Sequence, residues 1–222
     1  MNVNLSGRVI ALSPAAIRLL LGLALATLSF GVFIEVTAEL YEDSEVTEID
    51  RAILLVIGRL RSDRLNQMFV DLTALGSPTI VALFTVIALL ILVVNQETRA
   101  AFYVLVNSVG AMLLTILVKL TVGRQRPEVI PHLVEVAGQS YPSGHTLAAT
   151  SLYLALTLVA CLHFRSWRIR AILLVVAGGL ILLIGFSRLY LGVHYPSDVV
   201  SGVFLGCAWT LCVIALLLRR HS

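Results

Sequence analysis

Three clusters of polar residues interrupt otherwise apolar sequence, at positions 119–127, 141–145 and 187–198. Together they contain arginine, lysine and histidine side chains, a serine–glycine pair and one aspartate. Charged side chains at the ends of apolar stretches are energetically costly, so they indicate a functional site. Arginine forks match the oxygens of a phosphate group, and lysine supplies a point charge beside them. The residue types therefore predict chemistry on a phosphorylated substrate.

Five of these residues form a candidate anion site. Lys119, Arg126 and Arg188 are fixed cations that need an anion to face. Ser143 and Gly144 stand where an apolar helix is expected to begin, and there the free backbone N–H groups and the helix dipole attract anions. Glycine also allows the backbone to approach a phosphate closely.

The histidines and the aspartate are candidates for catalysis. His194 and Asp198 are four residues apart, with Pro196 between them at a plausible first helical position. This spacing lets the carboxylate reach the imidazole Nδ1–H, which fixes the tautomer and makes the other ring nitrogen nucleophilic. His145 is then free to protonate the departing oxygen as a general acid. An unperturbed histidine titrates near pH 6.5, which suits both roles around neutral pH.

The composition places these clusters in a membrane protein. The 222 residues are 59% hydrophobic and 13% charged, with a mean hydropathy of +0.96. A soluble domain carries about 25% charged residues. The net charge of +3 does not indicate nucleic-acid binding, because no basic stripe with interleaved aromatic residues is present. We expect an all-α, integral membrane, single domain covering residues 1–222.

Six apolar stretches are predicted to span the bilayer, which requires about 20 residues. The predicted spans are 15–37, 78–94, 100–121, 146–163, 168–187 and 197–218. The second is short, and a helix broken at Gly76, Ser77 and Pro78 would join it to the apolar segment 65–75. Because connections 3–4 and 5–6 of a six-span protein lie on one face of the membrane, the three clusters can converge there.

An amphipathic helix is predicted between spans one and two. Ile49, Ile53, Val56, Ile57 and Leu60 recur at helical spacing within a mostly acidic connection. A helix of this kind lies in the membrane interface. Packing of the same helix against the end of the bundle is an equally good interpretation.

The distribution of lysine and arginine bears on the orientation in the membrane. One face of the predicted bundle holds Arg8, Arg18, Arg99, Arg165, Arg168, Arg170, Arg219 and Arg220. The other face holds Arg51, Arg59, Arg61, Arg64, Lys119, Arg124, Arg126 and Arg188. The numbers are equal, but the last four belong to the clusters and are explained by chemistry. Without those four, the face with the termini has eight basic residues and the other face has four. This excess predicts that both termini are cytoplasmic and that the site faces outward.

Each cluster by itself also has a purely structural interpretation. A cation at a helix end can extend to the membrane interface, a Pro-Ser-Gly-His segment can be a turn with a helix cap, and His194 with Asp198 can be a capping pair. Three such coincidences on one membrane face favour a shared function instead. For Arg124, substrate contact and anchoring at the interface stay equally open.

The three clusters resemble the signature of the type-2 phosphatidic acid phosphatase superfamily. The matching patterns are Lys-x6-Arg-Pro, Pro-Ser-Gly-His and Ser-Arg-x5-His-x3-Asp, without a departure at any signature position. The resemblance implies that His194 attacks phosphorus to form a phosphohistidine, that Asp198 orients it, and that His145 protonates the leaving group and then activates water. It also implies that Lys119, Arg126, Arg188, Ser143 and the Gly144 N–H hold the phosphoryl oxygens. No metal and no other cofactor are expected.

The implied substrate is a phosphorylated membrane lipid. Bacterial relatives of this compact kind act on undecaprenyl diphosphate, phosphatidylglycerol phosphate, phosphatidic acid or lipid A phosphate. The outward-facing site favours undecaprenyl diphosphate, with phosphatidylglycerol phosphate second, and the bacterial inner membrane as location. The alternative from another class is a non-catalytic lipid-phosphate binder or flippase that uses the same cations. Such a protein would not need the His194–Asp198 pair or His145, so their presence favours the enzyme. Vanadate-dependent haloperoxidases share the anion site, but they are soluble. The oligomeric state is not predicted.

Overall fold

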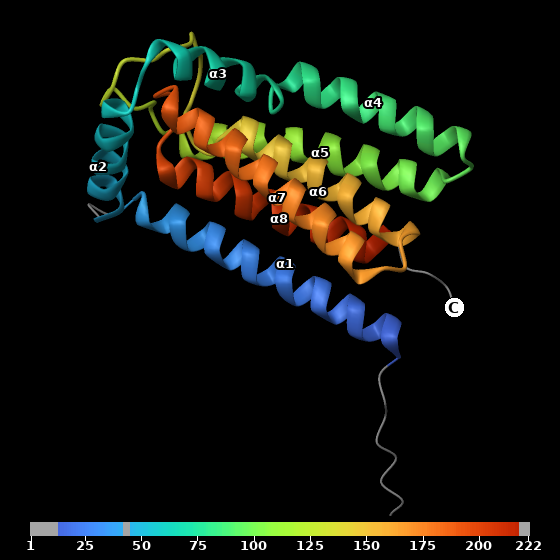
Figure 1. Ribbon diagram of the computed structural model, residues 1–222. Coiled ribbons are helices and arrows are strands. Elements are labelled where there is room, and N and C mark those ends of the chain that lie inside the picture. The colour runs from blue at the N-terminus through green and yellow to red at the C-terminus, as the bar shows by residue number, and fades with distance from the viewer. Residues whose placement is uncertain (1–12, 42–44, 218–222) are drawn as a thin grey trace, which may run out of the picture.

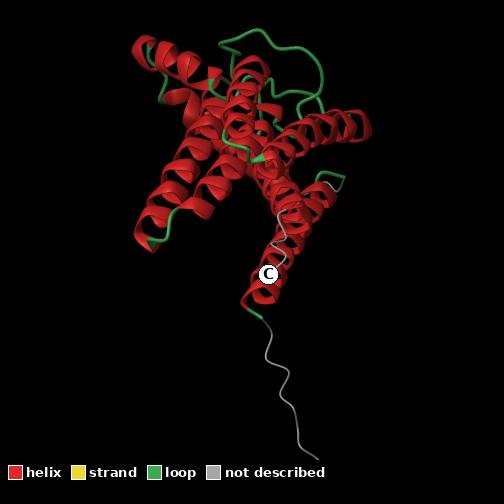
Figure 2. Ribbon diagram, turned by 90° about the vertical axis from the view of Figure 1, so that its right-hand side faces the viewer, coloured by secondary structure: helices red, strands yellow, loops and turns green. Residues whose placement is uncertain are grey.

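The computed structural model describes residues 13–41 and 45–217, and in this part of the chain all regular structure is helical (Figure 1, Figure 2). Its helices are α1 Pro14–Glu39, α2 Glu45–Arg59, α3 Asp63–Ala74, α4 Pro78–Val94, α5 Thr98–Val122, α6 Gly144–His163, α7 Trp167–Tyr190 and α8 Pro196–Leu217. The expected all-α class is confirmed. Some predictions fall on residues that the structure does not describe. These are Arg8, Arg219 and Arg220 of the lysine and arginine distribution, and residue 218 of the last predicted span.

The predicted spans correspond to α1, α4, α5, α6, α7 and α8. Five of these helices are long and apolar enough to cross a membrane by themselves. The exception is α4, whose 17 residues extend about 25 Å, short of a hydrocarbon core of about 30 Å. With α3 it forms a bent pair, at an angle of 43°, so a break is present where the sequence predicted one. That the two pieces together make one span stays a prediction.

The break between α3 and α4 follows from local sequence. Ser77 caps α4 by accepting a hydrogen bond from the Ile80 N–H at 3.3 Å, and Pro78 occupies the first turn. Proline is favoured there because its missing N–H would have no partner in the helix. The main departure from the predicted boundaries is at α7, which continues to Tyr190 rather than 187 and therefore carries Arg188 in its last turn.

The bundle has a small buried core and a largely apolar outer surface. One core cluster joins Tyr103 and Val104 of α5 to Ala155 of α6 and Val213 of α8. Outside the bundle, large apolar side chains such as Val175, at 74% exposure, face away from the protein. This surface fits a hydrocarbon solvent, as expected of a multi-pass membrane protein.

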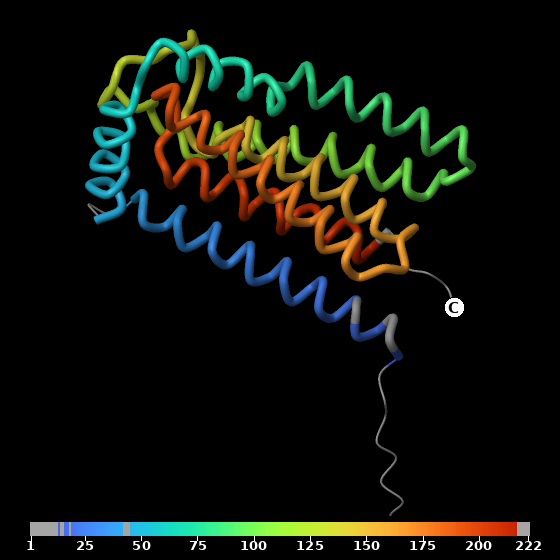
Figure 3. The backbone as a smooth tube through the Cα atoms, in the orientation of Figure 1, coloured from blue at the N-terminus to red at the C-terminus, as the bar shows by residue number. Residues whose placement is uncertain are grey.

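Helix α2 lies across one end of the bundle, as the tube in Figure 3 shows. Its buried residues are Asp50, Leu54 and Ile57, whereas Ile49 and Val56 remain more than half exposed. The helix therefore packs on the bundle and also leaves apolar side chains uncovered. Its location in the membrane interface stays a prediction.

Arg61 connects the segment that follows α2 to two other parts of the chain by hydrogen bonds. The apolar spacing predicted a helix that continues to Leu60, but α2 ends at Arg59. Arg61 instead donates hydrogen bonds to the carbonyl oxygens of Tyr190, at 2.7 and 3.0 Å, and of Pro131, at 2.7 Å. The end of α2 is thus tied to the end of α7 and to the connection between α5 and α6.

Candidate active site

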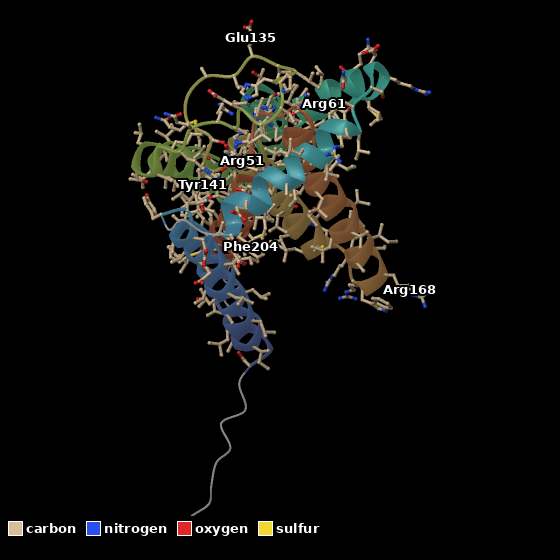
Figure 4. The ribbon with its side chains drawn as sticks, turned by 90° about the vertical axis from the view of Figure 1, so that its left-hand side faces the viewer. Arg51, Arg61, Glu135, Tyr141, Arg168 and Phe204 are labelled. Carbon is tan, nitrogen blue, oxygen red and sulfur yellow. The ribbon has the colours of Figure 1, made fainter. Side chains whose placement is uncertain are left out.

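All three polar clusters lie at the end of the bundle that α2 crosses. Here α5 and α7 end, and α6 and α8 begin (Figure 1). In Figure 4, which faces this end, α2 crosses in front with Arg51 on it, and the connection that carries Glu135 arches above. The convergence of the clusters, expected from six spans, is therefore present in the structure.

His194 and Asp198 are held by the first turn of α8. The Asp198 carboxylate accepts a hydrogen bond from the Tyr195 N–H at 2.8 Å, so it closes back on the residue before the helix as in a capping box. The same oxygen lies 3.3 Å from His194 Nδ1. Both side chains are almost completely buried. The predicted contact across four residues is thus observed.

The other ring nitrogen of His194 faces a cation. Its Nε2 lies 3.4 Å from Arg126 Nη1. Arg126 also donates to the carbonyl oxygens of Ala137, Gly138 and Val193, at 2.8–3.0 Å. Lys119, in the last turn of α5, donates to the carbonyl oxygen of Gln139. The connection between α5 and α6 therefore holds both cations beside the imidazole.

Arg188 reaches the site from the last turn of α7. It is 3% exposed, and its Nη1 donates to Thr73 Oγ1 of α3 at 2.8 Å. Among the described groups, none accepts a hydrogen bond from its Nε. A buried donor of this kind is costly to leave unpaired. Arg188 therefore retains a donor that suits an anionic ligand.

His145 and the start of α6 complete the site. The charges of Arg188, Arg126, Lys119 and the His194 ring all act on the His145 imidazole. Next to it, a Cβ placed on Gly144 would lie 3.9 Å from Lys119 Cε. The neighbouring Ser143 is fully buried, and its Oγ pairs with Thr146 Oγ1 at 2.9 Å. The structure thus brings together all eight predicted site residues, with the Ser143 hydroxyl bonded within α6.

Burial changes the titration expected of the nucleophile candidate. Desolvation lowers the pKa of His194 to about 4, and the nearby charges of Arg188 and Arg126 act in the same direction. The hydrogen bond and charge of Asp198 oppose this effect only in part. His194 is therefore neutral well below the ordinary histidine range, which differs from the expected titration near pH 6.5.

Several residues of the site were not predicted from the sequence. Ser140 donates to Asp198 Oδ2 and lies 3.4 Å from His194 Nδ1. It directly precedes the second cluster, and this position is its only signal in the sequence. Thr73 holds Arg188 from a segment with no motif at all. Arg124 donates to Asp198 Oδ1 at 2.7 Å and to Asp50 Oδ2 at 2.8 Å, an arrangement that neither open interpretation described.

The site consists of cations, histidines and one carboxylate. Within residues 13–41 and 45–217, no three histidine, cysteine, aspartate or glutamate side chains gather as metal ligands. An open hollow of about 400 Å³ adjoins the site. It is lined by Gly123, Arg124, Gln125, Arg126, Gly138 and Gln139. Of the predicted phosphate-binding residues, Arg126 borders this hollow.

Comparison with known proteins gives consistent similarities. A model of the PAP2 superfamily matches residues 99–222, which include every predicted site residue. Phosphatidylglycerophosphatase B of Bacillus subtilis is 31% identical over 180 residues, covering 80% of this chain and 88% of that protein. Undecaprenyl-diphosphatase BcrC of the same organism is 30% identical over 135 residues, covering 58% of this chain and 61% of that protein.

A solved structure is similar over most of the bundle. The crystal structure described as that of the first transmembrane PAP2 type phosphatidylglycerolphosphate phosphatase from Bacillus subtilis superposes with a TM-score of 0.79 at 26% identity. The match covers 85% of this chain and 93% of that chain. It therefore extends well beyond the part that carries the three clusters.

Proposed function

This chain belongs to the PAP2 superfamily, and from that premise we propose that it hydrolyses undecaprenyl diphosphate through a phosphohistidine on His194. Its relatives identify it as a membrane phosphatase, a phosphoric ester hydrolase that acts on a lipid phosphate. The proposal adds the substrate, the covalent intermediate and the roles of individual residues.

The orientation of the His194 ring is the observation that carries the mechanism. Nδ1 lies 3.3 Å from the Asp198 carboxylate, and Nε2 lies 3.4 Å from Arg126 Nη1. With its proton on Nδ1, the ring presents the Nε2 lone pair to the cations that would bind a phosphate. A capping pair would not require a second ring nitrogen directed at arginine.

The reaction has two steps in this arrangement. The His194 Nε2 lone pair forms a bond to the terminal phosphorus, and the bond from phosphorus to the bridging oxygen breaks. That oxygen keeps the electron pair and takes a proton from protonated His145, so undecaprenyl phosphate leaves. His145 then accepts a proton from water, whose oxygen attacks phosphorus, and the nitrogen–phosphorus bond breaks to release phosphate.

Fixed cations would stabilise the charge that develops on the phosphoryl oxygens. Lys119, Arg126, Arg188, Ser143 and the Gly144 N–H are the proposed phosphate-binding groups. Electrostatic stabilisation is stronger in a partly dehydrated site than in water. Arg188 is already buried with a donor directed to no described acceptor, which supports its role.

The substrate proposal depends on the orientation in the membrane. With cytoplasmic termini, the site faces the outer side of the bacterial inner membrane, where undecaprenyl diphosphate is recycled. Phosphatidylglycerol phosphate is the second candidate. It is favoured by the phosphatidylglycerophosphatase B relative, which matches 80% of this chain.

Phosphate release from a panel of lipids tests the proposal. Purified protein in detergent is supplied with undecaprenyl diphosphate, phosphatidylglycerol phosphate, phosphatidic acid or lipid A, and free phosphate is measured. We expect the highest kcat/KM with undecaprenyl diphosphate, and loss of activity in His194→Ala. A higher kcat/KM with another lipid would show that the proposed substrate is wrong. Full activity in His194→Ala would show that His194 is not the nucleophile. Binding of all lipids without phosphate release would favour the non-catalytic alternative.

A further inference from the structure

A buried aspartate of α2 reaches into the start of α8. Asp50 is 2% exposed, although it belongs to an acidic segment whose neighbours Glu45 and Glu48 are exposed. Its Oδ1 accepts a hydrogen bond from the Ser197 N–H at 2.9 Å, and its Oδ2 accepts one from the Ser197 hydroxyl. Asp50 therefore satisfies a free N–H in the first turn of α8, which an N-cap side chain would otherwise do.

Arg124 joins this aspartate to the one that contacts His194. Its Nη2 donates to Asp50 Oδ2 at 2.8 Å, and its Nη1 donates to Asp198 Oδ1 and to the Ser197 hydroxyl, both at 2.7 Å. The guanidinium also lies over the Tyr195 ring, 4.0 Å from its centroid. Both terminal nitrogens are thus engaged with protein groups, and the guanidinium plane is covered by an aromatic ring.

The Asp198 carboxylate is held from both sides. Oδ2 accepts hydrogen bonds from Ser140 and from the Tyr195 N–H, and it faces His194 Nδ1. Oδ1 is the oxygen that Arg124 binds. A fully buried carboxylate with one oxygen directed at the imidazole therefore depends on Arg124 to fix the other oxygen. Asp50 in turn fixes Arg124.

We propose that Asp50 and Arg124 are positioning residues, which hold Asp198 against His194 and connect the catalytic pair to the surface helix α2. The polar side-chain atoms of both residues bond to protein groups: Arg124 to Asp50, Ser197 and Asp198, and Asp50 to Ser197 and Arg124. The inference rests on the proposed function of His194 and adds to it two residues that are not signature positions, although Arg124 lies within the first pattern. It also gives α2 a role, because the helix then supplies the far end of the chain Asp50–Arg124–Asp198–His194.

Three variants distinguish a positioning role of Asp50 and Arg124 in catalysis from a role in folding alone. Asp50→Asn can still accept from the Ser197 N–H, so it removes mainly the charge that Arg124 meets. Arg124→Gln removes the cation, and the double variant removes both. Glu48→Gln, which loses the same charge from an exposed position two residues away on α2, is the matched control.

Steady-state rates provide the first measurement. We expect kcat to fall about tenfold in Asp50→Asn and about a hundredfold in Arg124→Gln, with KM within about twofold of the parent. Adding Asp50→Asn to Arg124→Gln should lower kcat by less than about twofold, because the aspartate acts through the arginine. Asp50→Glu should recover most of the rate. A raised KM with unchanged kcat, or fully additive losses, would overturn the proposal.

The titration of His194 provides a second measurement that does not need activity. It is followed by NMR of histidine-labelled protein in detergent and assigned with His194→Gln. The charges of Asp198 of α8, Arg188 of α7 and Arg126 of the α5–α6 connection act on the ring, and the ring acts on His145 of α6. Lys119 of α5 interacts with Arg126, Arg188 and Asp198. Arg124 of the α5–α6 connection binds Asp198, and Asp50 of α2 binds Arg124. An anion favours the imidazolium and a cation disfavours it.

The two single variants should therefore shift the midpoint in opposite directions. Asp50→Asn should lower the His194 midpoint, and Arg124→Gln should raise it, each by about half a pH unit. Glu48→Gln should leave both the midpoint and the rate unchanged. Shifts in the same direction, or none, would contradict the arrangement. If no lipid of the panel releases phosphate, the proposed function fails, while the titrations still decide whether Asp50 and Arg124 position the pair.

Discussion

At the scale of single residues, burial decides which form of His194 is present. Desolvation lowers its pKa to about 4 against the opposing effect of Asp198. Protonation would remove the Nε2 lone pair, so the nucleophilic form is lost as the pH falls through the pKa. It is fully present above that value, including at pH 6, where an unperturbed histidine would be largely protonated.

We therefore expect the His194 imidazole to titrate near pH 4 in the native protein, as measured by histidine NMR. Asp198→Asn removes the anion that favours the imidazolium, so the midpoint should move lower still. The same variant should lower kcat by a factor of about 10² to 10⁴, since the tautomer is no longer fixed. A parent midpoint near 6.5 would show that the ring is solvated rather than buried.

The residues that were predicted and those that were missed differ in how far along the chain their partners lie. His194 and Asp198 are four residues apart, so one helical turn brings them together and the spacing alone predicts their contact. Thr73 and Arg188 are 115 residues apart, and Ser197 and Asp50 are 147 apart. Such contacts depend on how α2 and α3 dock on the bundle, which no local pattern specifies.

At the scale of elements, α3 acts on the site through Thr73. Replacing Thr73 by valine keeps the shape of the side chain and removes the acceptor for Arg188 Nη1. A hydrogen bond to a charged group contributes about 1.5–3 kcal/mol, so kcat/KM for the lipid should fall about tenfold or more. The measurement is phosphate release at varied lipid concentration in detergent.

Thr85→Val provides the matched control on the neighbouring helix α4. Thr85 is equally buried, at 7% against 8% for Thr73, but it bonds to the Val81 carbonyl and to Ser108. Its replacement should leave kcat/KM within about twofold. Equal effects of the two variants would mean that the loss reflects general packing rather than the hold on Arg188.

The close approach of α8 to α6 depends on a glycine one turn beyond Asp198. A Cβ on Gly202 would lie 2.9 Å from the Ser143 carbonyl oxygen and 3.2 Å from the Leu147 backbone nitrogen. Backbone atoms cannot move aside without separating the helices. Gly202→Ala should therefore lower the free energy of unfolding by about 1–3 kcal/mol, measured as a reduced Tm in detergent, and also reduce activity.

Gly179→Ala is the matched control for Gly202→Ala, because it makes the same change from glycine to alanine within a helix. A Cβ at Gly179 of α7 meets no atom within 4 Å, and alanine is a better helix former than glycine. The Tm should stay the same or rise slightly. A parallel fall in both variants would argue against a specific contact between α6 and α8.

The elements themselves were largely predictable because the bilayer fixes their length. Apolar stretches of about 20 residues must be helical to satisfy their backbone groups in hydrocarbon. The exact residues at which the helices begin and end were less predictable. Arg188 is polar yet helical, so α7 extends beyond its apolar stretch, whereas the apolar spacing up to Leu60 suggested a longer α2 than is present. Helix ends depend on caps and tertiary contacts, such as those of Arg61.

At the scale of the whole molecule, the remaining prediction is the orientation in the membrane. The two ends of the bundle differ in chemistry: one carries the candidate site, α2 and the connection with Glu135, and the other carries Arg168 at the start of α7 (Figure 4). Cytoplasmic connections carry an excess of lysine and arginine. Arg165, Arg168 and Arg170 lie close together in the sequence there, so we expect that end to face the cytoplasm.

Labelling of single cysteines with a membrane-impermeant maleimide tests this orientation. The parent has its three cysteines, Cys161, Cys207 and Cys212, replaced by alanine. Glu135 and Arg168 are both exposed, so a cysteine at either position is accessible from its own side. Glu135→Cys should react in intact cells, and Arg168→Cys only after permeabilisation. The reverse pattern would place the site in the cytoplasm and remove the argument for undecaprenyl diphosphate, because that substrate is expected on the outer face.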